Sequence, residues 1–254
     1  MIVKHGSKIG TATVISNTLL KAGAMIPNEK ITVKYITAHN TGNWDVPANN
    51  YYRSLKRQNE SKPDAGKSSY HFVVDDKEIY QIIDTNNKTW HAGDSTGNAT
   101  SVGVEICMFK DKARHNKAKA NAQALIVELL KGHKLGSDKV KKHQDWSGKY
   151  CPQTILDETN GWANFTKEIK NLYNGASTSP TTWKNGSYEG KKAKVTADVL
   201  NVRKGRGTNF AILGKLKKGE VVNLSYCLDK WVSIPYAGGT NGMGYIHTDY
   251  LEII

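Results

Sequence analysis

Apolar and polar positions follow two different patterns along this chain. Between residues 31 and 173, runs rich in β-branched and aromatic residues alternate with segments whose apolar positions recur every three or four residues. The runs at 31–38, 71–83 and 101–109 predict strands, with a hairpin turn at Asp75-Asp76-Lys77. The periodic segments around 48–60, 114–134 and 161–173 predict helices. This alternation predicts an α/β domain in which helices flank a central mixed β-sheet.

The pattern changes at a stretch of small polar residues around Asn174–Thr182, which is typical of a linker. The later segment shows no helical period, and turn residues separate its short apolar runs. These runs predict a small all-β barrel. The expected strands are Lys194–Ala197, Leu200–Arg203, Ala211–Leu216, Val221–Tyr226, Trp231–Ile234 and Met243–His247. We therefore expect a first domain over 1–173, a linker over 174–190 and a second domain over 191–254.

Composition narrows the class of protein. Hydrophobic residues make up 38% of the 254 residues, which is enough for a core, and no apolar run approaches the length of a membrane span. The N-terminus lacks the apolar segment of a signal peptide, so we expect no standard export route. The net charge of +13 predicts attraction to polyanions, either nucleic acid or anionic cell-wall polymers. The lysines are scattered along the chain, which disfavours a dedicated nucleic-acid arm.

Three cysteines, an odd number in well-separated places, do not form a disulfide framework. Cys107 lies inside the apolar run Val102–Phe109, and Cys227 follows the run Val221–Leu224, so we expect both to be small core residues. Cys151 differs, because polar residues flank it and a proline follows. Its thiol is therefore the one available for chemistry.

Cys151 lies eight residues after His143, and His39 lies far upstream, at the end of an apolar run. A histidine at a strand end is by itself more often structural than a ligand. Two imidazoles and one thiolate, however, make a set of zinc ligands that leaves the fourth position open, as in catalytic zinc sites. Should His39, His143 and Cys151 converge, the chain is a hydrolase that uses zinc-activated water.

Two charged residues are candidates to assist such a metal. Glu105 is a lone carboxylate inside the apolar run Ser101–Phe109, and burial would suit it for proton transfer. Lys149 precedes Cys151 by two residues, so both side chains face one side of an extended segment, where Lys149 would stabilise an oxyanion. The alternatives are a strand-edge glutamate facing water and an ordinary solvated lysine.

Two further segments combine aromatic and imidazole side chains. Tyr70-His71-Phe72 begins a predicted strand, and Trp90-His91 precedes a flexible Ala92-Gly93 turn. Such side chains suit sugar or peptide binding, so His71, Trp90 and His91 are candidate substrate-binding residues. Either histidine is alternatively an ordinary polar surface group.

Residues 28–173 resemble the zinc-dependent N-acetylmuramoyl-L-alanine amidases of the type 2 class, relatives of peptidoglycan recognition proteins. The resemblance rests on segments in the family order, namely Tyr35–Thr41, Ser69–Asp75, Trp90–Gly93, Ser101–Ile106 and His143 with Cys151-Pro152. It implies Zn²⁺ held by His39, His143 and Cys151, with Glu105 as acid/base and Lys149 as transition-state stabiliser. It also implies Tyr70 near the metal and His91 along the substrate groove, and cleavage of the amide between N-acetylmuramic acid and L-alanine.

Residues 191–254 look like a bacterial Src-homology-3-like wall-binding domain, through Leu200–Phe210, Leu216–Glu220, Trp231-Val232 and Gly244–Ile246. Arg206 stands where such domains usually have proline. The first 27 residues match neither resemblance.

An amidase joined to a wall-binding domain without a signal peptide is similar to a phage endolysin. Such an enzyme is made in the host bacterial cytoplasm and acts on the wall after release. The expected partners are Gram-positive peptidoglycan and anionic wall polymers, without a specific nucleic acid. The alternative function is non-catalytic peptidoglycan binding and recognition, although relatives of that kind typically lack the metal cysteine.

Overall fold

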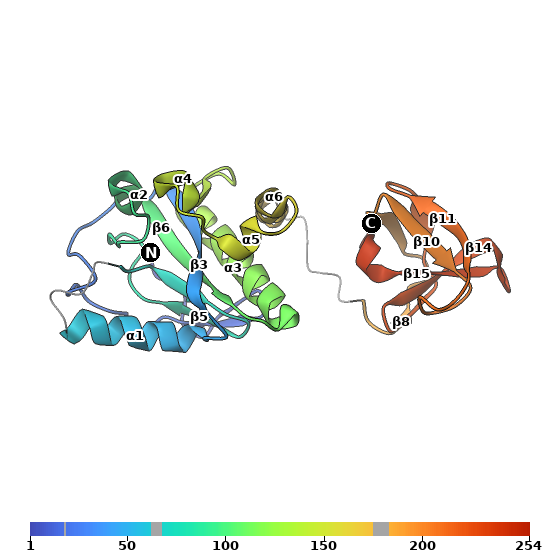
Figure 1. The fold of residues 1–254 in the computed structure, drawn as a ribbon, viewed down its shortest axis with the longest axis horizontal. Helices are drawn as coiled ribbons and strands as arrows, with labels where there is room; N and C mark the ends of the chain where they lie inside the picture. The colour runs from blue at the N-terminus through green and yellow to red at the C-terminus, as the bar shows by residue number, and fades with distance from the viewer. Residues whose placement is uncertain (18, 62–67, 175–182) are drawn as a thin grey trace. The chain divides into compact units, whose positions relative to one another are not determined.

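The computed structural model describes residues 1–17, 19–61, 68–174 and 183–254. These residues form two compact units, one before and one after residues 175–182 (Figure 1). Most of the predicted linker, residues 175–182, lies outside the described residues. In the described part of the chain, no helix has both the length and the apolarity needed to cross a membrane.

The first unit contains a seven-stranded mixed sheet in the order β1-β2-β5-β4-β6-β3-β7, with helices packed against it (Figure 1). The predicted α/β class is confirmed. The strands are β1 Lys8–Ile9, β2 Ala12–Ile15, β3 Tyr35–Trp44, β4 Phe72–Val74, β5 Glu78–Gln81, β6 Ser101–Met108 and β7 Val140–Lys142. The helices are α1 Ala48–Ser61, α2 Ser95–Thr100, α3 Lys112–Gly132, α4 Gln144–Ser147, α5 Gln153–Leu156 and α6 Gly161–Tyr173.

Parallel pairing at the centre of this sheet aligns residues that are far apart in the sequence. β3 pairs in parallel with β6 on one side and with β7 on the other. The register places His39 of β3 directly opposite Glu105 of β6. Because directly paired residues project to the same face of a sheet, these two side chains share one face. β4 and β5 form the predicted hairpin around Asp75–Lys77.

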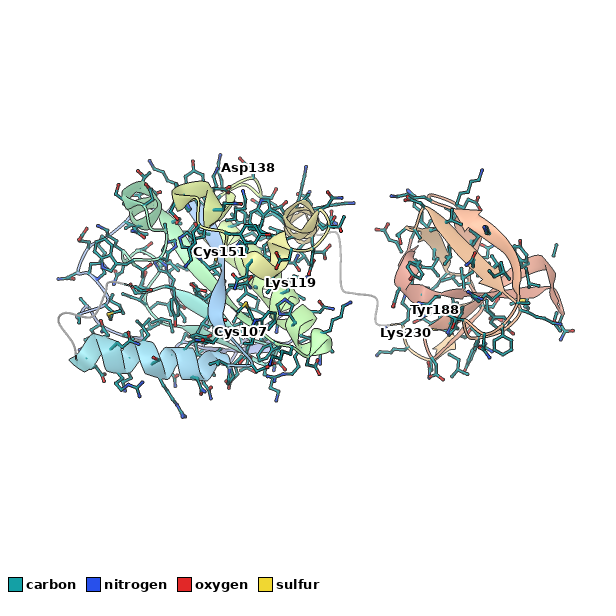
Figure 2. The ribbon with its side chains drawn as sticks, viewed as in Figure 1. Cys107, Lys119, Asp138, Cys151, Tyr188 and Lys230 are labelled. Atoms are coloured by element: carbon teal, nitrogen blue, oxygen red, sulfur yellow. The ribbon has the colours of Figure 1, made fainter. Side chains whose placement is uncertain are left out.

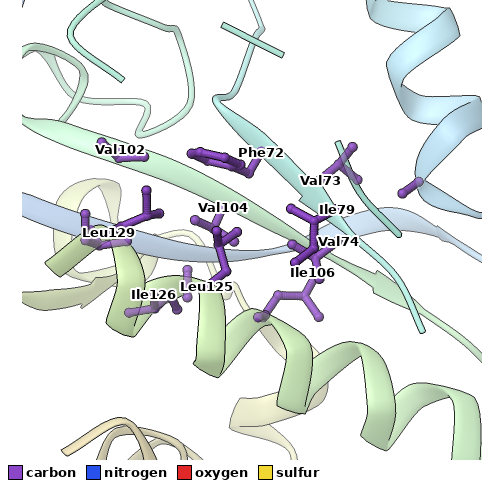
Figure 3. Packing of buried hydrophobic residues seen from close by; sticks show 14 of the residues in the cluster. Phe72, Val73, Val74, Ile79, Val102, Val104, Ile106, Leu125, Ile126 and Leu129 are labelled. Carbon is purple, nitrogen blue, oxygen red and sulfur yellow. The ribbon is translucent and has the colours of Figure 1, made fainter. Parts of the chain in front are cut away.

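The apolar core fills the space between this sheet and α3. Figure 3 shows Val104 of β6 close to Leu125 and Ile126 of α3, and all three side chains are completely or almost completely buried. Successive strand residues alternate between the two faces. Val104 therefore faces α3, whereas Glu105 faces the opposite side, on which Tyr52 of α1 stacks against Tyr80 of β5.

The N-terminal segment, which matched no recognisable pattern, extends the sheet. β2 pairs in parallel with β5, and β1 pairs with β2 in a short antiparallel ladder. Ala12 and Val14 of β2 are fully buried. These strands are short, which explains why the sequence pattern did not single them out.

The second unit is all β, as expected, and combines a six-stranded with a three-stranded sheet. Its elements are β8 Gly186–Ser187, β9 Lys192–Val195, β10 Val199–Arg203, β11 Ile212–Lys217, β12 Val221–Asn223, β13 Tyr226–Leu228, β14 Trp231–Thr240, β15 Met243–His247, a 3₁₀ turn Thr248–Tyr250 and β16 Leu251–Ile253. The single strand expected over Val221–Tyr226 is divided, because β12 pairs with β9 in one sheet and β13 pairs with β14 in the other.

The barrel begins before residue 191. Tyr188 is buried in the core of the second unit (Figure 2), Trp183 packs against that core, and β8 pairs with β13. The C-terminal part of the predicted linker, residues 183–190, is therefore part of the barrel. The sequence of this segment does not show that its two aromatic residues pack into the core of the second unit, because the residues that they contact lie far away in the chain.

Candidate metal centre and active site

Three side chains from separate parts of the first unit meet at one point. They are His39 in the middle of β3, His143 directly after β7, and Cys151 just before α5. All three are buried, and one nitrogen or sulfur atom from each lies within 4.8 Å of the other two. His39 and His143 become neighbours because β7 runs parallel to β3, with Ala38 opposite Lys142.

The donor atoms of this cluster are arranged to receive a cation. The Nδ1 atoms of His39 and His143 lie 3.0 Å apart, and the backbone N–H of Asn40 donates to the Cys151 Sγ at 3.4 Å. Burial lowers the pKa of both histidines, that of His39 well below its usual range, so both imidazoles are neutral and carry a lone pair. Nitrogen and sulfur donors at this spacing fit a transition-metal ion.

Burial raises the pKa of the Cys151 thiol to about 11, with the Asn40 N–H opposing that shift. A metal ion would reverse the balance, because a coordinating thiol is deprotonated outright. The cluster therefore fits a bound cation better than it fits a set of ordinary buried side chains.

Glu105 lies beside this cluster on the same face of the sheet. Its Oε2 atom is buried and has no hydrogen-bond partner among the described residues. Burial raises the pKa of Glu105 to about 8, against the opposing charge of Lys149. The interpretation as a strand-edge glutamate is wrong, because β6 lies between β4 and β3.

A pocket of about 460 Å³ opens next to Glu105. It is lined by Asn40, Thr41, Gly42, Tyr51, Ser68, Tyr70, Glu105, Lys149, Tyr150, Cys151 and Gln153. Larger hollows exist, such as one of about 710 Å³ around Asp76 and Arg114, but they lack this gathering of metal-binding and proton-transferring groups. The structure thus brings Tyr70, Glu105, Lys149 and Cys151 to one cavity.

Tyr70 reaches this pocket from the segment before β4. Its hydroxyl donates to the Tyr51 carbonyl at 3.4 Å. Burial, followed by the charge of Glu105, raises the pKa of the phenol far above its usual value. Tyr70 is therefore a hydrogen-bond donor throughout the neutral pH range.

The three expected substrate-binding residues do not line this pocket. His71 is completely buried, and its ring is held by the Asn87 carbonyl at 2.8 Å and the Gly103 N–H at 3.0 Å. His91 is buried behind His39, at 2.9 Å between His91 Nδ1 and His39 Nε2. Trp90 is half-buried, and the Lys88 ammonium lies 4.4 Å from its ring centroid.

These placements correct the expectation for the two histidines. The predicted substrate-binding role and the alternative of a polar surface group both need an exposed imidazole, whereas backbone and ring partners satisfy these two buried imidazoles inside the domain. The sequence cannot distinguish the two environments, because the partners come from other elements.

Sequence reasoning missed Asn40, although it directly follows His39. Its N–H contacts the Cys151 sulfur, and its Oδ1 accepts hydrogen bonds from the Thr154 N–H at 2.9 Å and the Thr154 hydroxyl at 2.8 Å. Asn40 thereby joins β3 to the segment that carries Cys151. Its position next to a candidate ligand was the available signal.

Comparison with known proteins finds relatives of both units. A family model described as N-acetylmuramoyl-L-alanine amidase matches residues 29–154, and one described as bacterial SH3 domain matches residues 198–252. The amidase CwlA of Bacillus subtilis is 43% identical over 151 residues, which are 57% of this chain and 53% of that protein. The amidase XlyB of Bacillus subtilis is 38% identical over 181 residues, covering 69% and 51%.

A solved structure of an amidase domain is also similar to the first unit. The catalytic domain of XlyA, another Bacillus subtilis amidase, superposes with a TM-score of 0.55 at 39% identity, covering 62% of this chain and 99% of that domain. The chain therefore belongs to the N-acetylmuramoyl-L-alanine amidase family and carries a bacterial SH3 domain after its amidase domain. It spans about half the length of the curated relatives it matches.

Proposed function

We propose that this protein is a peptidoglycan hydrolase that cleaves the amide bond between N-acetylmuramic acid and the L-alanine of the stem peptide. The observation that carries the proposal is the cluster of His39, His143 and Cys151 beside a pocket that also holds Glu105. The similar proteins are named as amidases of this specificity. The alternative of non-catalytic recognition is not favoured, since the metal-binding cysteine is retained.

We propose zinc as the resident metal, held by His39, His143 and Cys151. Two imidazoles and a thiolate are typical zinc ligands, and three protein ligands leave a position open for substrate or water. Zinc held there would supply a Lewis acid and lower the pKa of a water ligand to about 7.

The charged and phenolic side chains around the pocket have separate roles in the proposed reaction. Glu105 takes the proton of the attacking water and passes it to the leaving nitrogen. The Lys149 ammonium stabilises the negative charge that develops on the carbonyl oxygen. The Tyr70 hydroxyl does the same by turning its one hydrogen from the Tyr51 carbonyl to the substrate. A donor of this kind is typically worth about 10²- to 10³-fold in rate.

We propose that the second unit holds the enzyme on the bacterial cell wall. The matching family is a bacterial SH3 domain, and the chain carries a net charge of +13. Positive charge of this size would attract the protein to anionic wall polymers through a salt-sensitive field. The protein would then act on the cell wall, where its proposed substrate lies.

Product analysis tests the proposed bond directly. Purified Bacillus subtilis walls are digested with the zinc-loaded protein, and new amino termini and new reducing sugar ends are measured. We expect new L-alanine amino termini without new reducing ends, because amide hydrolysis leaves the glycan intact. Reducing ends alone would overturn the proposal.

A matched variant controls for contaminating hydrolases. Glu105→Gln keeps the size of the side chain and removes the proton acceptor, so it should lower product release by about 10²- to 10⁴-fold. Its zinc content should equal that of the wild type. Full activity in this variant would assign the proton transfer to another residue.

Removal of the metal tests the proposed zinc site. A chelator should abolish wall digestion, and added Zn²⁺ should restore it. The metal-free protein should also melt at a lower temperature, because an ion that binds only the folded chain stabilises it. Cys151→Ala should show neither response, and a chelator-insensitive wild type would contradict the assignment.

A further inference from the structure

We propose that His91 is a positioning residue of the metal site, which holds His39 in the tautomer that presents its Nδ1 lone pair to the metal. A series of hydrogen bonds from Trp146 to His39 determines which group donates and which group accepts at each step. The inference rests on the proposed metal site but not on which bond the enzyme cleaves.

The first part of this chain runs from Trp146 to Ser101. The Trp146 indole N–H, which can only donate, contacts the Thr37 hydroxyl oxygen at 3.0 Å. The Thr37 hydroxyl lies 2.9 Å from Ser101 Oγ. Ser101 Oγ lies 2.8 Å from the carbonyl oxygen of Gly97. A carbonyl oxygen only accepts, so the Ser101 hydroxyl donates to it, and the Thr37 hydroxyl must donate to Ser101.

The direction of these bonds determines where His91 carries its proton. The His91 Nε2 atom lies 3.2 Å from both the carbonyl oxygen and the hydroxyl oxygen of Ser101. The carbonyl is an acceptor, and the only hydroxyl hydrogen of Ser101 is already directed to Gly97. His91 Nε2 must therefore be the donor.

A neutral imidazole has one N–H, so the other ring nitrogen of His91 is an acceptor. That nitrogen, Nδ1, lies 2.9 Å from His39 Nε2, which must then be protonated. The lone pair of His39 is left on Nδ1, the atom that lies 3.0 Å from His143 Nδ1 in the metal cluster. Metal-binding histidines generally depend on such a partner for tautomer and ring orientation.

Packing holds His91 in this position. The ring is buried, and the Asn98 Oδ1 accepts hydrogen bonds from the backbone N–H groups of His91 at 2.9 Å and Ala92 at 2.8 Å. A Cβ on Gly103 would lie 2.7 Å from the His91 ring, so β6 can pass behind the imidazole only with glycine there. The residue is thus enclosed behind His39.

The test compares variants of the full chain at His91. His91→Phe keeps a buried ring and removes the acceptor, so the affinity for Zn²⁺, measured by competition with a chromophoric chelator, should fall about 10- to 100-fold. His91→Asn restores an acceptor near the position of Nδ1 and should recover part of that loss. His133→Phe, a half-buried histidine outside the cluster, should leave the affinity unchanged.

A spectroscopic measurement on the wild type does not depend on any variant folding. Imidazole ¹⁵N shifts of the metal-free full chain should show His39 protonated at Nε2 and unprotonated at Nδ1. A proton on His39 Nδ1 would overturn the inference, and so would wild-type zinc affinity in a folded His91→Phe variant. Either result would leave the product analysis of wall digestion untouched, whereas failure of that analysis alone would overturn only the proposed function.

Discussion

At the scale of single residues, the proposed active centre contains a carboxyl group whose burial disfavours its charged form. One oxygen of Glu105 is buried without a hydrogen-bond partner in the described part of the chain, and burial raises the pKa of this residue to about 8. Burial of an unpaired charge destabilises a fold unless the group is neutral. A carboxyl group with a pKa near neutrality can both take up and release a proton, which is the property that the proposed reaction needs.

This pKa predicts a pH dependence of stability in the metal-free protein. The usual pKa of a glutamate is 4.5, whereas the pKa of Glu105 in the folded protein is raised to about 8. Between these two pH values, folded Glu105 holds a proton that the unfolded chain has released. The free energy of unfolding should therefore fall as the pH rises through this range, by about 1.4 kcal/mol per pH unit at most. Chelator-treated wild type and Glu105→Gln are compared by urea unfolding at several pH values.

The glutamine variant is uncharged at every pH, so it should lose this part of the slope and become the more stable protein above pH 8. The histidines and other groups are common to both proteins and cancel in the difference. Parallel stability curves for the two proteins would show that Glu105 does not have a raised pKa.

At the scale of elements, one buried asparagine on α3 joins several parts of the first unit. The Asn121 Oδ1 accepts a hydrogen bond from the Thr11 N–H at 2.8 Å, and its Nδ2 donates to the Asp75 carbonyl at 2.9 Å. Thr11 lies in the turn between β1 and β2, and Asp75 lies in the hairpin between β4 and β5. Asn121 thereby fixes both turns on the helix.

Asn121→Ala should lower the free energy of unfolding by about 1 to 3 kcal/mol, because it leaves the buried Asp75 carbonyl without its partner and removes the hydrogen bond of the exposed Thr11 N–H. Thermal or urea unfolding of the full chain measures the loss. The matched control is Asn116→Ala, an exposed position of the same helix, which should be close to neutral. Equal effects of the two substitutions would show that Asn121 does not hold the turns.

At the scale of the whole molecule, we assign catalysis to the first unit and cell-wall binding to the second. Each has a hydrophobic core of its own, one around the seven-stranded sheet and one inside the barrel. A solved relative that corresponds to the first unit alone shows that such a domain can exist by itself. Covalent linkage of a catalytic and a binding unit raises the effective concentration of the enzyme at its polymer.

A chain that ends at Asn174 should therefore sediment less with purified walls than the full chain does, while its turnover on a small soluble muramyl peptide stays unchanged. The separated second unit, added back in solution, should not restore sedimentation, because the two units are no longer linked. Undiminished sedimentation of the shortened chain would reject wall binding by the barrel.

By itself the sequence determined what depends on neighbouring residues. The alternation of apolar runs predicted the hairpin β4–β5, and the three- and four-residue spacing of apolar positions predicted α3, since both periods are local properties. The order of motifs also indicated the family and the residues His39, His143 and Cys151. The short strands β1 and β2 carry too few residues to show a period.

Only the tertiary structure decided which of the chemically suitable residues face the pocket and which support it. The sequence around His71 and His91 is equally compatible with an exposed site. In the structure both imidazoles are buried, and they form hydrogen bonds with Gly103, Ser101 and His39. The division of β12 from β13 and the start of the barrel before residue 191 likewise follow from pairing with distant strands. Burial and hydrogen-bond direction arise from partners far away in the chain, and for that reason no local pattern contains them.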